Sequence, residues 1–224
     1  MRLSVLLTTY NRTEIALKTI AHVLENLEYE DYFFLIADDG SDEGHLATLC
    51  QACGPKFLDA LDVQRKGVGV GMNWGLLRSV ELGAEHIMIL EDDWALVQKF
   101  NPAPAMGLLS DDHNDIGMIR YGYLSPGPRG EIITGSGKLW LKLQQYAEFQ
   151  YTYAGHASIR HIKFHRYYGM FTEGLSPKLN ELDFCAKVNA KPAGPRVAWC
   201  MDYGDQGPFV HIGAVSLGGI EPAK

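Results

Sequence analysis

Apolar and polar positions alternate along the first hundred residues in a way that predicts strands and helices in turn. Compact apolar runs that end in polar or turn residues are typical of buried strands, and apolar residues at helical spacing lie between them. This alternation indicates a mostly parallel sheet with helices on both faces. The expected strands are Leu3–Thr9, Tyr32–Ala37, Leu58–Val63 and His86–Leu90, the expected helices are Thr13–Leu27, Leu46–Cys53 and Met72–Leu82, and Gly67–Gly71 is expected to form a glycine-rich turn.

The pattern changes after Pro102. We find no internal repeat and no low-complexity segment, so we expect a single domain over residues 1–224 with two packed halves, 1–100 and 101–224. In the second half, strands are expected at Ile116–Tyr123 and Tyr151–Ile159, helices at Ile162–Tyr168 and Leu179–Val188, an exposed loop or hairpin at Ser125–Gly137, and a loop-like tail from Lys191 with a short apolar run at Val210–Ile212.

Composition narrows the class of protein. Hydrophobic residues make up 46% of the 224 residues and charged residues 21%, which suits a globular core. The net charge of −7 argues against non-specific nucleic-acid binding, although a metal ion could still draw in an anionic substrate. The sequence shows no signal-peptide pattern and no apolar run of the ~20 residues that span a bilayer. We therefore expect a soluble, cytoplasmic protein without a transmembrane segment.

The four cysteines change this picture little. Cys50 and Cys53 have the spacing of half a zinc site or of a redox pair, but Cys185 and Cys200 do not supply the second half. Reduced structural thiols are the preferred interpretation.

Polar clusters follow three of the expected strands. These are Thr8-Thr9-Tyr10-Asn11, Asp38-Asp39-Gly40-Ser41 and Glu91-Asp92-Asp93. Ordinary turn chemistry explains any one of them, but parallel strands would bring all three to one sheet edge, where α/β proteins bind ligands. The three adjacent carboxylates repel one another, and a bound Mn²⁺ or Mg²⁺ would relieve this. A solvated acidic loop is the alternative.

The order of four motifs resembles the family 2-like glycosyltransferases of GT-A fold. These motifs are Val5–Arg12, Ile36–Asp42, Gly71–Gly75 and Ile89–Trp94, and a weaker likeness continues through Gly155–Arg160, Tyr168–Glu173 and Asn180–Cys185. The resemblance implies an α/β, GT-A (Rossmann-like) fold with a mostly parallel central sheet flanked by helices. It also makes residues 1–100 the nucleotide-binding half and residues 101–224 the acceptor-binding half.

The resemblance implies roles for the residues at the strand ends. A nucleotide-sugar donor, with a UDP-sugar favoured because a carboxylate accepts the imide N–H of uracil, is expected to contact Thr9, Tyr10, Arg12, Asp38 and Asp39. Lys66 could reach a phosphate or the base, and Asn73 matches a family position near the donor. The family's metal-binding Asp-x-Asp appears here as Glu91-x-Asp93, with Asp92 in support.

The resemblance also suggests a general base and a third metal ligand. Glu181 occupies the family's base position, and Asp183 is the alternative, although both could simply be stabilising charges in the first turn of a helix. His211 precedes a glycine near the C-terminus and could bind the metal or be a buried core residue. His161 and His165 have zinc-pair spacing without a third ligand, and we interpret them as surface or acceptor-site residues.

The expected function is therefore metal-dependent transfer of a sugar from a nucleotide diphosphate to a glycan or other hydroxyl acceptor, with inversion at the anomeric carbon. A retaining transferase is the alternative among enzymes, because the base motif is imperfect. A catalytically inactive sugar- or nucleotide-binding module is the non-enzymatic alternative.

Overall fold

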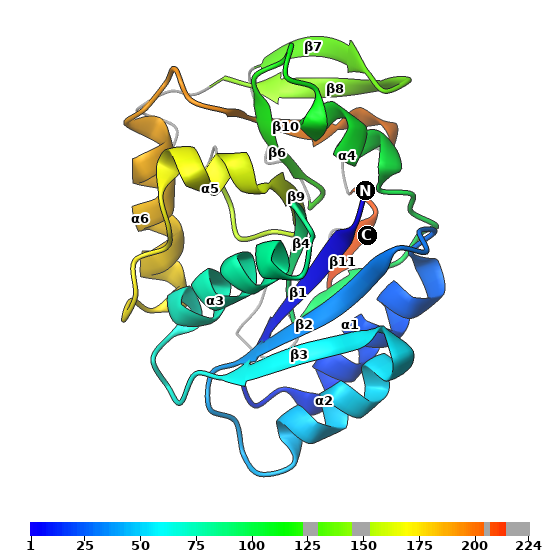
Figure 1. Ribbon diagram of the computed structural model, residues 1–224, viewed down its shortest axis with the longest axis vertical. Helices are drawn as coiled ribbons and strands as arrows, with labels where there is room; N and C mark the ends of the chain where they lie inside the picture. The colour runs from blue at the N-terminus through cyan, green and yellow to red at the C-terminus, as the bar shows by residue number, and fades with distance from the viewer. Residues whose placement is uncertain (123–129, 145–152, 204–206, 214–224) are drawn as a thin grey trace, which may run out of the picture.

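A computed structural model describes residues 1–122, 130–144, 153–203 and 207–213, and the account below concerns these ranges. Their central sheet has nine strands in the order β3-β2-β1-β4-β9-β6-β10-β8-β7 (Figure 1). The bounds of these strands are β1 Leu3–Thr9, β2 Tyr32–Asp38, β3 Phe57–Asp62, β4 His86–Glu91, β6 Ile116–Arg120, β7 Gly130–Gly135, β8 Lys138–Leu143, β9 Ser158–His161 and β10 Arg196–Cys200.

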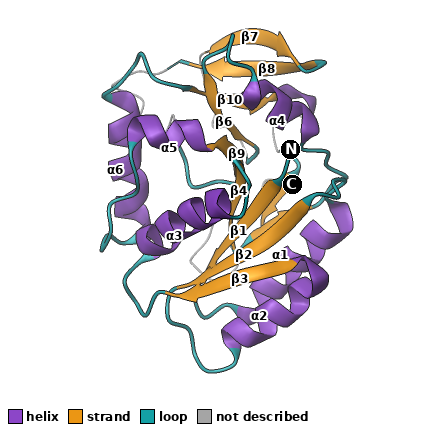
Figure 2. Ribbon diagram, in the orientation of Figure 1, coloured by secondary structure: helices purple, strands orange, loops and turns teal. Residues whose placement is uncertain are grey.

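A second sheet and six α-helices complete the fold (Figure 2). β5 (Trp94–Leu96) and β11 (Phe209–His211) form a two-stranded antiparallel sheet. The helices are α1 Thr13–Asn26, α2 His45–Cys53, α3 Val68–Glu81, α4 Ala103–Ser110, α5 Ile162–Tyr168 and α6 Pro177–Asn189, with short 3₁₀ turns at Gly54–Lys56 and Met201–Tyr203. None of the helices in the described ranges is long and apolar enough to cross a bilayer.

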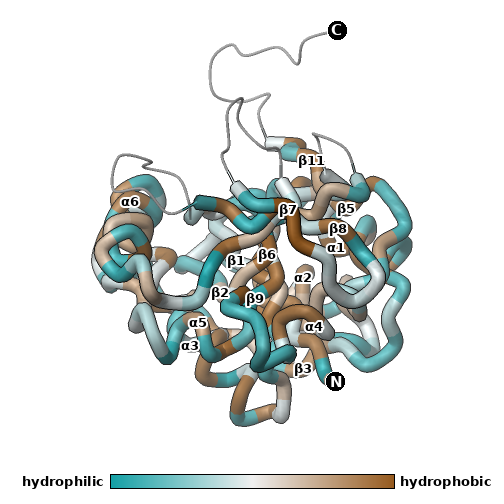
Figure 3. The backbone as a smooth tube through the Cα atoms, turned by 90° about the horizontal axis from the view of Figure 1, so that it is seen from above, coloured by the Kyte–Doolittle hydropathy of each residue, from teal (hydrophilic) through white to brown (hydrophobic). Residues whose placement is uncertain are grey.

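Both faces of the parallel strands β1, β2 and β4 are buried, because helices cover each side. Successive side chains of a strand point to opposite faces, and Leu3, Val5 and Leu7 of β1 pack into one apolar cluster with α1, α2 and α4. Leu6 packs into the opposite cluster with α3, α5 and α6. In Figure 3 the apolar stretches of the strands accordingly lie inside a more polar periphery. The continuous apolar runs in the sequence are explained by this two-sided burial.

The first hundred residues follow the predicted elements closely, with one correction. The segment expected to be a turn at Gly67–Gly71 is the first turn of α3, which begins at Val68. Gly67 itself has a φ of +92°, a backbone conformation that suits glycine. A Cβ on Gly71 would lie 2.8 Å from that of Ala37, so glycine lets the helix approach β2 closely. Gly71 therefore marks the close packing of α3 against β2.

The tail from Lys191, expected to be a loop, contains a strand of the central sheet. β10 runs parallel to β6 and antiparallel to β8. It was missed because five residues that include an alanine and a cysteine give little periodic signal. The loop-or-hairpin segment contributes β7, which pairs with β8 as a hairpin. The strand expected at Tyr151–Ile159 is shorter and later in the chain, as β9 at Ser158–His161. Residues 123–129 and 145–152 lie outside the described ranges.

β9 joins the two halves into one sheet. It lies antiparallel between β4 of the first half and β6 of the second. The parallel character predicted for the sheet therefore holds for β3, β2, β1 and β4, and it changes at β9. Because β9 is antiparallel to β4, with Ser158 opposite Ile89, the segment before β9 lies at the carboxyl end of β4.

Candidate active site

The carboxyl ends of β1, β2 and β4 meet at one edge of the sheet, as the sequence predicted. Thr9 of β1 is in register with Asp38 of β2. Just beyond the strands, the N–H groups of Asp39 and Asp92 donate to the carbonyl oxygens of Thr9 and Thr8, each over 3.0 Å. Side chains distant in sequence are thus held by backbone pairing at one place, where α/β folds bind ligands.

A pocket of about 260 Å³ opens at this edge. Tyr10 stands in its wall with a half-exposed ring, and the guanidinium of Arg65 lies 4.5 Å from the ring centroid. The exposed face of an aromatic ring can stack on a nucleobase. Other residues that line the pocket are Thr9, Arg12, Ala37, Asp39, Gly71 and Glu91.

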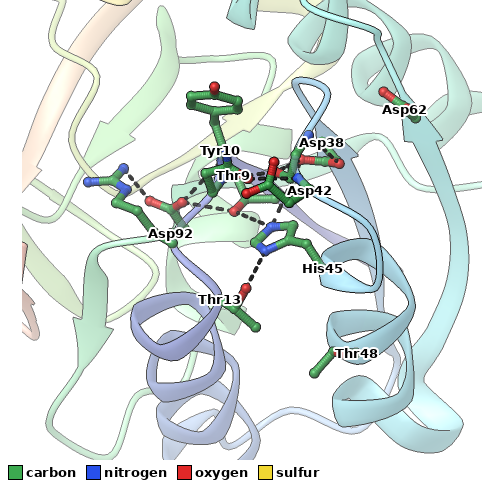
Figure 4. Close-up of polar contacts among 12 residues, drawn as sticks. Thr9, Tyr10, Thr13, Asp38, Asp42, His45, Thr48, Asp62 and Asp92 are labelled. Atoms are coloured by element: carbon green, nitrogen blue, oxygen red, sulfur yellow. Dashed lines mark hydrogen bonds and ion pairs between the residues drawn. The ribbon is translucent and has the colours of Figure 1, made fainter.

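Asp38 and Asp92 are buried and are not among the residues that line this pocket; Figure 4 shows them among the polar contacts around Thr9. Asp92 accepts a hydrogen bond from the Thr9 hydroxyl over 2.8 Å, and the same hydroxyl contacts the His45 ring over 3.0 Å. Asp38 accepts hydrogen bonds from the backbone N–H and the hydroxyl of Ser41. Both aspartates therefore stabilise the strand ends that form the pocket, and sequence reasoning missed His45 because its role appears only in three dimensions.

Of the other residues predicted to contact the donor, Asp39 lines the pocket, whereas Lys66 and Asn73 do not. Asp39 lines the pocket and accepts a hydrogen bond from the N–H of Gly67 over 2.9 Å. Lys66 is exposed beside it but is not part of the pocket lining. Asn73 is buried, and its amide is engaged by the N–H and carbonyl of Phe171. In this structure Asn73 joins α3 to the segment before α6 and does not face the pocket.

Arg12 lies between the pocket and the acidic motif. Its guanidinium forms ion pairs with Asp92 and with Asp93, and the Nη1–Oδ2 distance to Asp93 is 2.6 Å. Burial lowers the pKa of Arg12, but the two carboxylates outweigh this and raise the pKa above its ordinary value. The arginine expected to contact a nucleotide is therefore the counter-ion of the aspartates in this structure.

The side chains of Asp93 and His211 contact each other. The β5–β11 sheet places His211 opposite Trp94, and the His211 Nε2 atom lies 3.2 Å from Asp93 Oδ2. Asp93 is 4% exposed, and its Oδ1 has no hydrogen-bond partner among the described residues. An orphaned carboxylate oxygen beside an imidazole fits a divalent cation that takes its other ligands from phosphate and water. Within the described ranges no three such side chains form a closed metal cage.

Glu91 and Glu181 face the same backbone group from two elements. The N–H of Gly155 donates to Glu181 Oε1 over 2.7 Å, and a Cβ built on Gly155 would lie 3.2 Å from Glu91 Oε1 and 3.7 Å from Glu181 Oε1. Burial, followed by the charges of Asp93, Glu181 and Asp92, raises the pKa of Glu91 to about 8. α6 and the segment before β9 thus bring the predicted base beside the acidic motif.

Asp183 and the paired histidines lie elsewhere. Asp183 is bound by Lys187 at 2.9 Å and by the Thr172 hydroxyl at 2.7 Å. Burial raises its pKa, but these partners outweigh that effect and lower it. His165 is buried against Arg160, so the expectation of a surface position does not hold for it. All four cysteines are free thiols.

Three comparisons set these observations beside known proteins. The solved structures that resemble the chain include S. aureus TarS 1-349, with a TM-score of 0.63 and 16% identity over 90% of this chain and 58% of that one. The same TarS fragment in complex with UDP-GlcNAc has a TM-score of 0.62 at 16% identity, over 90% and 56% of the two chains. The mannosyltransferase PcManGT from Pyrobaculum calidifontis, in complex with GDP-Man and Mn²⁺, has a TM-score of 0.55 at 13% identity, over 88% and 56%.

These similarities show the GT-A fold, and the chain spans just over half the length of the structures named. No curated protein sequence matches it. The family model described as "Glycosyl transferase family 2" matches residues 4–120, just over half of the chain, and this range contains all three strand-end clusters. The chain therefore belongs to glycosyl transferase family 2.

Proposed function

We propose that the protein is a metal-dependent glycosyltransferase that moves a sugar from a UDP-sugar to an acceptor hydroxyl with inversion at the anomeric carbon. One observation carries the proposal: the Asp93–His211 pair and the Glu91–Glu181 pair lie at the same sheet edge as the pocket. Membership of family 2 and the fold shared with a UDP-GlcNAc complex of TarS support it.

The donor's nucleoside fits the pocket at the ends of β1 and β2. Tyr10 offers a ring for stacking, and Asp39 offers a carboxylate that accepts hydrogen bonds from the uracil imide or the ribose hydroxyls. Glu91 of the acidic motif lines the pocket, as does Arg12, which forms ion pairs with Asp92 and Asp93. We therefore orient the donor with its base between Tyr10 and Asp39 and its diphosphate toward Arg12.

Mn²⁺ or Mg²⁺ would be held by Asp93 and His211, with Glu91 beside them. When bound, such an ion neutralises the charge that develops on the leaving diphosphate. The two protein ligands leave coordination positions for phosphate oxygens and water, which is how these ions are commonly bound at nucleotide sites. Asp92 stabilises the end of β1 rather than binding the ion.

Glu181 is the proposed general base. One of its oxygens accepts the Gly155 N–H, which orients the carboxylate. Its role would be to accept the proton of the acceptor hydroxyl. Asp183 is unsuited to this role, because Lys187 and Thr172 already engage it. A base that activates the acceptor opposite the leaving diphosphate leads to inversion.

The test is turnover of a panel of UDP-sugars with Mn²⁺ and with EDTA. Release of UDP that requires metal, and a product of inverted anomeric configuration by NMR, are the expected results. Retention of configuration would favour the retaining alternative. Absence of both turnover and donor hydrolysis with every sugar would favour an inactive binding module.

A further inference from the structure

The Arg12 guanidinium lies beside the Asp93 carboxylate, at which a cation would bind. It contacts Asp93 Oδ2 at 2.6 Å, and His211 contacts the same oxygen at 3.2 Å. The other oxygen, Oδ1, is buried. A divalent ion that coordinates Asp93 would lie next to the positive guanidinium, and two cations in contact in a partly buried site repel each other strongly.

Arg12 is also able to leave. Its side chain is 41% exposed and lines the pocket, whereas the Asp92 and Asp93 side chains are almost completely buried. Asp92 would keep the hydrogen bonds that the Thr9 hydroxyl at 2.8 Å and the Tyr10 N–H at 3.3 Å donate to its Oδ2, but its buried Oδ1 would lose the ion pair with Arg12. Asp93 would keep the contact with His211 but lose the ion pair with Arg12, so departure of the guanidinium leaves a carboxylate oxygen of each aspartate without its counter-ion and favours a replacement cation.

We infer that Arg12 is a resident counter-ion of the acidic motif, which exchanges its carboxylate partners for the donor's diphosphate when metal binds. The inference rests on the proposed function. A guanidinium binds phosphate oxygens as well as carboxylates, often through two parallel hydrogen bonds. Arg12 borders the pocket as well as the aspartates, so a diphosphate bound in the pocket would lie next to its side chain.

This exchange couples the two ligands. Metal alone must displace Arg12 into water, but with nucleotide present the displaced guanidinium gains a phosphate partner. Mn²⁺ should therefore bind weakly to the free protein and more tightly to its UDP complex. By thermodynamic linkage, Mn²⁺ must tighten UDP binding by the same factor.

The experiment measures Mn²⁺ affinity, without turnover, by calorimetry and by the EPR signal of free Mn²⁺. Arg12→Ala should bind Mn²⁺ at least tenfold more tightly than the unmodified protein when UDP is absent, and UDP should then improve its Mn²⁺ affinity far less. Arg12→Lys should lie between the two, since it keeps the charge but not the forked geometry.

Arg78→Ala is the matched control. Arg78 also bridges two carboxylates, of Asp59 at 2.8 Å and Glu81 at 3.0 Å, but it lies on α3 about 15 Å along the helix axis from Val68 in the pocket wall. Its removal should leave Mn²⁺ affinity unchanged with and without UDP. Thermal unfolding in EDTA will show that each variant is folded.

Two results would overturn the inference in different ways. Equal or weaker Mn²⁺ binding by Arg12→Ala in the absence of UDP would refute the exchange and leave the proposed metal site standing. No Mn²⁺ binding by any form, with or without UDP, would refute the proposed metal dependence itself, and the exchange with it.

Discussion

Replacement of Glu91 by glutamine should stabilise the metal-free protein at alkaline pH. The carboxyl of Glu91 is half-buried, and desolvation together with neighbouring carboxylates raises its pKa from 4.5 to about 8. Between these values the unfolded chain is ionised at this position while the folded protein holds the proton. Stability from this group is therefore full below pH 4.5 and is lost as pH rises to about 8.

The size of the effect follows from that interval. Each pH unit corresponds to about 1.4 kcal/mol, so a pKa raised from 4.5 to about 8 sets an upper limit of roughly 5 kcal/mol, and about 2–5 kcal/mol is expected. In a chain of this length, that difference raises Tm by roughly 5–15 °C. Glu91→Gln keeps the shape of the side chain but cannot ionise, so it avoids the loss.

The assay is thermal and urea unfolding in EDTA at pH 5 and pH 8.5. The free energy of unfolding of Glu91→Gln, minus that of the unmodified protein, should be near zero at pH 5 and strongly positive at pH 8.5. The exposed Glu43 provides a control, because Glu43→Gln should show no such dependence. Parallel pH profiles for Glu91→Gln and the unmodified protein would refute the proposed burial of this charge.

Further substitutions test the other parts of the site. Glu181→Gln should lower kcat about 10²–10⁴-fold with UDP affinity retained, whereas Asp183→Asn should do much less; the opposite order in steady-state kinetics would exchange their roles. Asp39→Ala should weaken UDP binding by roughly 1–3 kcal/mol, and an unchanged Kd by calorimetry would remove Asp39 from the donor site. Asp93→Ala and His211→Ala should each weaken Mn²⁺ binding at least tenfold in the UDP complex, and undiminished Mn²⁺ affinity in both would contradict the ligand assignment.

The parallel half of the fold could be predicted because its signals are local. The bounds of β1 match the apolar run Leu3–Thr9, and polar clusters mark the strand ends where the pocket opens. Parallel pairing then requires these ends to be neighbours, so the shared edge followed from the strand assignment alone. The start of α3 could not be predicted, because the close packing of Gly71 against Ala37 depends on the tertiary structure.

The second half depends on long-range contacts that the sequence does not display. β10 is short and lies between β6 and β8, so its pairing is fixed by strands more than fifty residues earlier. Arg12 shows the same limit at the site. It stands in a motif expected to contact nucleotide, but its partners Asp92 and Asp93 are about eighty residues away, and only the packed fold brings them within reach.

The small sheet of β5 and β11 has a consequence for the order of folding. Phe209 is in register with Leu96, so His211 reaches Asp93 only after a span of more than a hundred residues has been closed. Contacts across such spans are slow to form, because chain entropy is lost before the pairing is gained. We expect the strands around β1 to assemble early and His211 to be placed late, so that a chain still emerging from the ribosome would carry the pocket before it carries a complete cation-binding pair.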